Sequence, residues 1–266
     1  MILIADSGST KCDWALIQSK SEIIEFNTMG FNPLFHNEDL ISSTLNNTTE
    51  VKKHSNEVEY IFYYGAGNST KKKKNVLQRA LGKSFSNAKH IYSGHDLTGA
   101  ALATYEGEPC ISCIIGTGSN SCYFDGDVAS EKIPALGHIL GDEGSGAYFG
   151  NKLLASFLYN KLPTHIHQAF QERYNFSKED IIDSVYTKPY ANVYLASFMK
   201  FMSDYKEDAY IHEIISNGFY EFLNTHVLCY NNAKHVPIHF VGSVAFYFEN
   251  ELRKIAQNLD LKIGRI

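Results

Sequence analysis

The 266-residue sequence contains no apolar run long enough to cross a lipid bilayer. A membrane-spanning helix needs about eighteen consecutive apolar residues, and the N-terminal stretch MILIAD reaches an acidic residue too early to be the core of a signal peptide. Net positive charge is also lacking, because the formal charge is −5 and the pI is about 6.1. No overall positive field would attract a nucleic-acid backbone or an anionic membrane. These absences predict a cytoplasmic protein whose partner is a small molecule, with no nucleic acid and no membrane among its partners.

Cysteines are scarce and do not form a pattern. There are five, an odd number, and their scatter does not resemble a disulfide framework, so we expect reduced thiols. Cys110 and Cys113 have the spacing of half a metal site, but no second pair of this kind exists, and residues three apart on a strand point to opposite faces. The lysine run 71–74 has no interleaved aromatic residues and predicts a solvated helix face.

The sequence does contain enough apolar material for one large core or two modest ones, since 44% of its residues are hydrophobic and 13% are aromatic. Residues 1–28 predict an antiparallel meander of three short strands. About a hundred residues later there is a similar succession of three predicted strands, in the stretches CISCIIGTG, SNSCYFDGD and ASEKIPA. Helices are predicted at about 38–54 and 69–83, mostly helical structure at about 141–231, and a last strand in LKIGRI.

This repetition predicts the fold class, which is α/β with two mixed domains and helices packed on each sheet. We expect an N-terminal domain over residues 1–105 and a C-terminal domain over residues 106–266, the latter with a helical insertion at about 141–231. No low-complexity linker separates them, so the boundary near 93–108 is expected within a helix.

Two predicted apolar strands are each followed by a similar turn, DSGSTK in the first case and GTGSN in the second. A phosphate needs several backbone N–H groups aimed at one point, and residues with small side chains let the backbone approach it closely. One such turn is more often a tight hairpin, whereas two after matching strands favour a phosphate site. The residues concerned are Gly8, Ser9, Thr10 and Lys11 in the first turn and Gly116, Thr117, Gly118 and Ser119 in the second.

Asp6 lies at the end of the first apolar strand, where a carboxylate is energetically unfavourable unless something compensates its charge. A Mg²⁺ ion that accompanies nucleotide phosphates and is held through water would explain it, and so would hydrogen bonds from the turn that follows.

A third stretch, HFVGSVAFYF, runs from a buried strand into Gly242 and Ser243 and then a helix. Flat rings or phosphates can sit against such a helix N-terminus, although ordinary α/β connections have the same form.

These three loops, in this order on duplicated units, resemble those of the actin-like ATPase superfamily. Within it, GTGSNS followed by ALGHILGDEGSGAYFG at 135–150 closely resembles the N-acetylglucosamine kinase and BadF/BadG/BcrA/BcrD ATPase family. The likeness spans nearly the whole chain, and GDEGSG is its most specific part. It implies two duplicated ribonuclease H-like domains with a nucleotide cleft between them, and it implies ATP and Mg²⁺ as cofactors.

The resemblance also implies a role for each matching residue. Asp96 falls where the sugar kinases carry their general base, and Asp6 would hold Mg²⁺ through water. Asn32 in GFNP, Asn120 and Asp142 match positions that contact the sugar. The ATP-binding positions would be Ser9, Thr10, Lys11, Gly116, Thr117, Gly118, Ser119, Gly242 and Ser243. Simpler readings stay open, because Asp96 could only cap its helix, and Asp142 and Glu143 could only stabilise a helix dipole.

Three functions from different classes follow. The leading one is an ATP-dependent amino-sugar kinase that phosphorylates a hydroxyl of N-acetylglucosamine or a related hexose derivative, with a homodimer left open. An ATPase coupled to a reductase needs cysteines that can share an iron–sulfur cluster, and none lies in an obvious cluster-binding context. A non-catalytic sugar sensor usually carries a DNA-binding helix-turn-helix before the first strand, and the sequence opens directly on MILIADSG.

Overall fold

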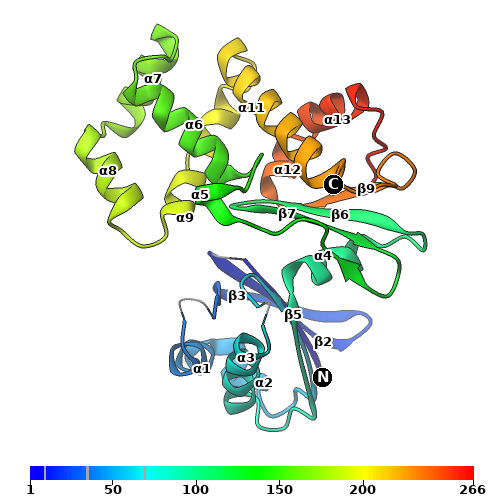
Figure 1. Ribbon diagram of the computed structural model, residues 1–266. Coiled ribbons are helices and arrows are strands. Elements are labelled where there is room, and N and C mark those ends of the chain that lie inside the picture. Colours follow the sequence, from blue (N-terminus) through cyan, green and yellow to red (C-terminus); the bar gives the residue numbers. More distant parts are fainter. Residues whose placement is uncertain (9, 34–35, 69) are drawn as a thin grey trace. The chain divides into compact units, whose positions relative to one another are not determined.

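The structure is a computed structural model that describes residues 1–8, 10–33, 36–68 and 70–266 (Figure 1). The chain divides into two compact units, Met1–Gly99 and Ala100–Ile266. The division falls within helix α4 (Asp96–Thr104). The domain limits 1–105 and 106–266 stay a prediction. Among the described residues, no helix has the length and apolar character that crossing a membrane requires.

The first unit is built on a five-stranded mixed sheet in the order β3-β2-β1-β4-β5. The first three strands form the predicted antiparallel meander, while β1, β4 and β5 run parallel to one another. Leu3, Ala5 and Ser7 alternate with exposed residues along β1, as a strand with one buried face requires. The strands are β1 (Ile2–Ser7), β2 (Lys11–Ser19), β3 (Glu22–Met29), β4 (Tyr60–Gly65) and β5 (His90–His95).

The predicted helix at 38–54 is instead two helices, α1 (Glu38–Asn47) and α2 (Thr49–His54). The break falls at Thr48, whose backbone is extended. Asparagine and threonine have poor helix propensity because they lose side-chain freedom or bond to nearby backbone, and residues 46–49 consist only of these two types. The second predicted helix is confirmed as α3 (Lys71–Ser84).

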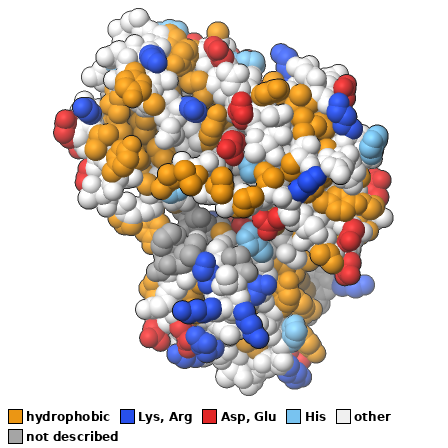
Figure 2. Space-filling view, in the orientation of Figure 1, with side chains coloured by type: hydrophobic (Ala, Val, Ile, Leu, Met, Phe, Trp, Pro, Cys, Tyr) orange, Lys and Arg blue, Asp and Glu red, His pale blue; other side chains and the backbone are white. Residues whose placement is uncertain are grey.

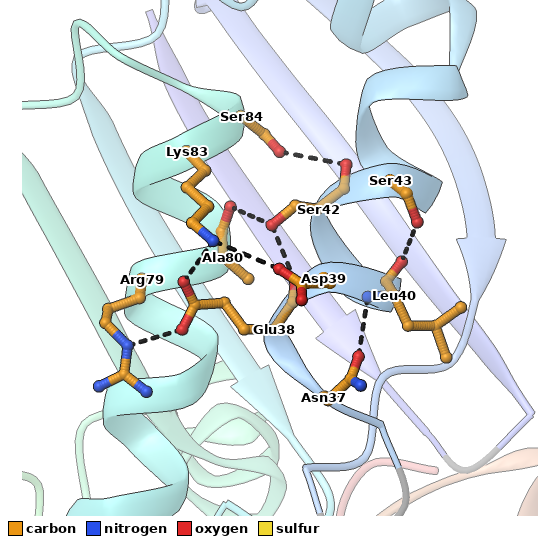
Figure 3. Close-up of polar contacts among 10 residues, drawn as sticks. All are labelled: Asn37, Glu38, Asp39, Leu40, Ser42, Ser43, Arg79, Ala80, Lys83 and Ser84. Carbon is orange, nitrogen blue, oxygen red and sulfur yellow. Dashed lines mark hydrogen bonds and ion pairs between the residues drawn. The ribbon is translucent and has the colours of Figure 1, made fainter.

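Helices α1 and α3 are joined by the polar contacts that Figure 3 shows. Glu38 accepts from Arg79 Nε at 2.7 Å and pairs with Lys83 Nζ at 2.7 Å. These hydrogen bonds and charges lower the pKa of Glu38. Ser42 Oγ also donates to the carbonyl oxygen of Ala80, at 3.4 Å. The contacts orient the two helices over the apolar core, while their own stabilisation is small because they are exposed.

The second unit has a four-stranded sheet in the order β8-β7-β6-β9. This succession matches β3-β2-β1-β4 of the first unit in both order and strand direction. The strands are β6 (Cys110–Ile115), β7 (Ser119–Phe124), β8 (Ala129–Ser130) and β9 (Ile238–Val241). The two sheets therefore confirm an α/β fold with two mixed sheets.

Two strands of the second unit were predicted too long. The stretch ASEKIPA pairs only at Ala129–Ser130, because the backbone N–H of Lys132 turns away to Tyr230 Oη. LKIGRI contributes an isolated bridge between Ile263 and Ile238 rather than a strand. Beyond the bridge the register shifts by one residue, because Phe240 N–H donates to Arg265 O at 2.9 Å, and the N–H of Arg265 bonds to the side chain of His239.

Between β8 and β9 the chain is mostly helical, as predicted, and an aromatic-rich core that includes Phe149, Phe219 and Phe222 lies beneath it. The helix predicted after Gly242 and Ser243 is split at Phe248. One element, η1, is a π-helix that directly continues α11. The helices are α5 (Gly137–Leu140), α6 (Gly146–Leu158), α7 (Thr164–Tyr174), α8 (Lys178–Tyr186), α9 (Ala191–Ala196), α10 (Met199–Asp204), α11 (Ala209–Phe222), η1 (Leu223–Val227), α12 (Ser243–Tyr247) and α13 (Glu249–Asn258).

Candidate functional site

The first glycine turn connects β1 to β2 as a tight hairpin. Gly8 N–H donates to the carbonyl oxygen of Lys11 at 3.0 Å, and Gly30 N–H donates to that of Thr10 at 3.0 Å. Lys11 Nζ lies 2.6 Å from Asp13 Oδ1, with both side chains exposed. Ser9, the remaining predicted phosphate contact of this turn, lies outside the described residues.

Asp6, Asp96 and the turn lie at one edge of the first sheet. Ser7 aligns with Gly65, and Gly65 aligns with His95, so the carboxyl ends of β1, β4 and β5 meet there. Asp6 is exposed, yet surrounding protein atoms desolvate its carboxylate and raise its pKa, and the nearby charges of Asp96 and Asp13 raise it further. A cation would offset this like-charge repulsion.

The described residues hold no group of three or more His, Cys, Asp or Glu side chains that could bind a metal ion directly. Asp6 therefore fits Mg²⁺ only in the predicted way, through water and together with phosphate oxygens.

Asp96 is the first residue of α4. Its Oδ1 accepts from Leu97 N–H at 2.9 Å and lies 2.7 Å from His95 Nδ1. The carboxylate thus accepts a hydrogen bond from the first turn of its own helix, as a capping role requires. That contact and a role as a base are compatible, because a carboxylate offers two oxygens and about four lone pairs.

Asn32 lies in the loop after β3, and the first unit anchors this loop on several sides. Phe31 N–H donates to Ser7 Oγ at 2.9 Å, and Tyr63 Oη donates to Phe31 O at 2.8 Å. Asn32 N–H donates to His36 Nδ1 at 3.2 Å. A Cβ at Gly67, where φ is +72°, would collide with Asn32 Oδ1. The predicted sugar contact is therefore held before any ligand arrives.

Asn68 was not identified as part of the site from the sequence. Its side chain is fully buried, and Nδ2 donates to Ser93 Oγ at 2.6 Å and to Gly94 O at 2.8 Å. It thereby connects the glycine-containing segment after β4 to the end of β5, directly before His95 and Asp96. The only local signal for it is a polar residue that directly follows Gly67, shortly after a strand that ends at Gly65.

The second glycine turn is held by the start of α6. Gly146 N–H donates to Gly116 O at 2.8 Å, and Ala147 N–H donates to Thr117 O at 3.1 Å. Within the turn, Gly116 N–H donates to Gly118 O at 2.9 Å. The carbonyl oxygens of Gly116 and Thr117 are thus engaged by the helix, which fixes the turn's backbone.

Asp142 lies directly beside this turn. A Cβ added at Gly118 would lie 3.0 Å from Asp142 Oδ2, so a larger residue there would crowd the carboxylate. Burial raises the pKa of Asp142, and a hydrogen bond from the backbone of Ser119 lowers it by less. Its φ of +59° is rare for a non-glycine residue, and such backbone strain is often found at functional sites.

Asn120 is buried with both ends of its amide engaged. Nδ2 donates to Glu131 Oε2 at 3.1 Å, and Oδ1 accepts from Ser121 N–H at 2.8 Å. A sugar contact at this residue, which stays a prediction, would have to share or replace these bonds.

Gly242 brings the third loop beside the second turn. Its φ is +119°, and a Cβ there would collide with the carbonyl oxygen of Ile115, the residue before Gly116. Ser243 opens α12, and Phe246 and Tyr247 follow at the spacing that places them on the same helix face. Both rings are well exposed, 62% and 64%, and lie 5.4 Å apart. The sequence analysis did not single out this aromatic pair.

Comparison with known proteins gives matches among solved structures. A protein from Porphyromonas gingivalis described as a candidate N-acetylglucosamine kinase is 36% identical over 100% of this chain and 94% of its own, with a TM-score of 0.94. A candidate N-acetylglucosamine kinase from Chromobacterium violaceum is 14% identical over 99% of this chain and 93% of its own, with a TM-score of 0.68. A ROK family glucokinase from Streptomyces griseus, solved with glucose and AMPPNP, is 14% identical over 99% and 90%, with a TM-score of 0.53.

No protein-family model matches the chain, and neither does a curated protein. The two more distant structures show that the fold is one that sugar kinases use. The identity of 36% over the whole length shows more, and the chain belongs to the same family as the P. gingivalis protein. The narrower resemblance to the BadF/BadG/BcrA/BcrD ATPases stays a prediction.

Proposed function

We propose that this protein is an ATP-dependent amino-sugar kinase that phosphorylates a hydroxyl of N-acetylglucosamine or a related hexose derivative. The observation that carries the proposal is the full-length likeness, at 36% identity, to a candidate N-acetylglucosamine kinase. The geometry supports it, because each unit has a glycine turn after its first strand with a carboxylate, Asp96 or Asp142, beside that region.

Asp96 is the proposed general base. In the reaction, a sugar hydroxyl oxygen attacks the γ-phosphorus of ATP and passes its proton to an Asp96 carboxylate oxygen. A new bond forms between that oxygen and phosphorus, the bond from the γ-phosphorus to the β,γ-bridging oxygen breaks, and ADP leaves. The hydrogen bond from Leu97 N–H orients the carboxylate for this task, and His95 Nδ1 lies beside the same oxygen.

ATP is proposed to bind through backbone N–H groups and hydroxyls of the two turns, with Lys11 adding positive charge. The residues are Ser9, Thr10, Lys11, Gly116, Thr117, Gly118 and Ser119, followed by Gly242 and Ser243 for the adenosine. Phe246 and Tyr247 share the exposed face of Ser243 and offer the adenine a surface to stack on. Mg²⁺, which Asp6 would hold through water, would neutralise charge on the phosphates.

The sugar is proposed to contact Asn32, Asn120 and Asp142. Asn32 is anchored through its N–H, which donates to His36 Nδ1, and Asp142 accepts a hydrogen bond from the backbone of Ser119, so both residues need little reorganisation on binding. Two ribonuclease H-like halves with the nucleotide between them belong to the same proposal, which the repeated strand order supports.

The reductase-coupled ATPase has less support. Cys12, Cys110, Cys113 and Cys122 are buried, and burial raises the pKa of Cys113 well above its usual value. Buried thiols of this kind are poor ligands for an exposed cluster, because a cluster needs accessible thiolates.

A coupled ADP-release assay across a panel of amino sugars tests the proposal, with Asp96→Asn as the control. We expect one or more N-acylated hexosamines to stimulate turnover, and the variant to lose that stimulation. Consumption of ATP that no sugar increases would contradict the kinase and favour an uncoupled ATPase. ATP binding without any turnover would favour a sensor.

A further inference from the structure

His226 is a buried histidine that the proposed reaction does not use. It lies in the π-helix η1 and is only 3% exposed. Turns of π-helix are rare and occur frequently at functional sites. Its ring stacks on Phe222, with centroids 5.0 Å apart and an interplanar angle of 19°. The ring is therefore fixed in orientation before any ligand binds.

The imidazole faces Glu143, which is 83 residues earlier in the chain. His226 Nε2 lies 2.9 Å from Glu143 Oε2. Nδ1 is buried, and none of the described residues forms a hydrogen bond with it. An Nε2–H that donates to the carboxylate is the tautomer that uses the contact with Glu143.

Glu143 follows Asp142 directly, in a turn that other elements also hold. The carbonyl oxygen of Glu143 accepts from Ser119 Oγ at 2.7 Å. Gly144, with φ of +68°, packs so closely on α11 that a Cβ would lie 2.9 Å from Phe222 Cβ. The turn over residues 142–145 thus contacts β7, α11 and η1, and the His226 bond is its contact with η1.

We propose that His226 is a positioning residue for the phosphotransfer site. Through Glu143 it holds the 142–145 turn, in which Asp142 has a positive φ, and so keeps the Asp142 carboxylate beside Gly118 and Ser119. The backbone reinforces this arrangement, because the carbonyl oxygen of His226 accepts from Ser121 Oγ at 2.6 Å. The inference rests on the proposed function, since it assigns Asp142 to the sugar.

Two substitutions of similar size and polarity separate positioning from packing. In His226→Gln the amide nitrogen can take the place of imidazole Nε2 and still donate to Glu143. In His226→Asn the amide reaches only as far as Nδ1, so Glu143 loses its donor. His235→Asn, at an exposed histidine, is the matched control.

The first measurement is steady-state kinetics with the intact chain. We expect His226→Asn to raise KM for the sugar about tenfold, the size typical of coupled residues in one network. KM for ATP should change little, because the bonds from Gly146 and Ala147 to the glycine turn remain. His226→Gln and His235→Asn should resemble the wild type. Glu143→Ala should match His226→Asn, and the double variant should be no worse than Glu143→Ala.

The second measurement is hydrogen exchange in peptides that cover residues 141–147, which does not depend on activity. His226→Asn should speed exchange there, and His226→Gln should not. Equal exchange and equal sugar KM in the two variants and the wild type would overturn the inference. It would also be overturned if sugar KM rose equally in both variants and both had a lowered Tm, because that result would indicate lost packing. If the wild type itself shows no sugar-stimulated turnover, the proposed function fails, and the exchange result alone decides whether His226 holds the turn.

Discussion

The side-chain amide of Asn68 donates a 2.8 Å hydrogen bond to the carbonyl oxygen of Gly94, two residues before Asp96. The same Nδ2 donates to Ser93 Oγ at 2.6 Å. A fully buried side chain from the loop after β4 therefore sets the path of the backbone that leads to the proposed base.

Asn68→Ala is expected to lower both stability and turnover. It leaves buried polar groups at Ser93 and Gly94 without their donor, which costs about 1–3 kcal/mol. Thermal unfolding should show a lower Tm, and kcat should fall because Asp96 loses its support. Asn75→Ala, at an exposed position of α3, is the control. Unchanged kcat in a clearly destabilised Asn68→Ala would show that the bond serves only the fold.

Gly67→Ala is expected to raise KM for the sugar. The residue has φ of +72°, which costs an alanine about 1 kcal/mol, and its new Cβ would push against Asn32 Oδ1. Gly107→Ala is a matched control, because φ there is +93° and nothing lies within 4 Å of the added Cβ. Both variants should lose stability in denaturant unfolding, Gly67→Ala more because of its clash with Asn32, and only Gly67→Ala should bind sugar more weakly. Equal sugar KM in the two would rule out Asn32 as a contact.

The stability of the protein is expected to fall in mildly acidic solution, partly through His36. Burial lowers the pKa of His36 below the value of about 6.5 that it has in an unfolded chain, and Nδ1 must stay unprotonated to accept from Asn32 N–H. As the pH falls below about 6.5, the unfolded state therefore takes up a proton that the folded state does not, so the free energy of unfolding decreases.

His36→Asn tests this, because its side-chain oxygen can replace Nδ1 as acceptor but does not titrate. Urea unfolding between pH 5 and 8 should show a smaller loss of stability in the variant. The buried His239 has a lowered pKa as well, so only the difference between wild type and variant reports on His36. Parallel curves would contradict the assignment.

Phe246→Ala is expected to raise KM for ATP about fivefold or more, since stacking of a base on an aromatic ring is worth about 1–3 kcal/mol and each 1.4 kcal/mol is tenfold. Stability should hardly change, because the ring is mostly exposed. Tyr186→Ala removes another exposed ring, on α8, and should leave KM for ATP unaltered. An unaffected KM in Phe246→Ala would place the adenine elsewhere.

The surface carries charged and apolar side chains that have no role in the proposed function. Figure 2 shows Lys and Arg side chains on the visible face of the first unit and hydrophobic side chains on that of the second. In the lysine run 71–74, for which a solvated helix face was predicted, Lys71 and Lys72 are exposed and Lys73 and Lys74 are half-buried. Leu136, Ile139 and Leu140 are exposed around α5.

Local pattern was enough to predict most elements. The meander β1 to β3 follows from apolar alternation and from turns within a few residues, so no distant contact is needed to recognise it. Two strand predictions were wrong where a neighbour far along the chain intervened. LKIGRI forms only an isolated bridge, because Phe240 N–H donates to Arg265 O and Arg265 N–H bonds to the side chain of His239, and ASEKIPA leaves the sheet for Tyr230.

The sequence by itself determined which segments could become glycine turns and where carboxylates would stand relative to strand ends, because those properties depend on residues adjacent in the chain. Only the tertiary structure decided what holds them. Asn68 reaches Gly94 across 26 residues, and His226 reaches Glu143 across 83. Such contacts leave no periodic trace in the sequence, since a hydrogen bond between distant segments depends on how strands and helices pack and not on local spacing.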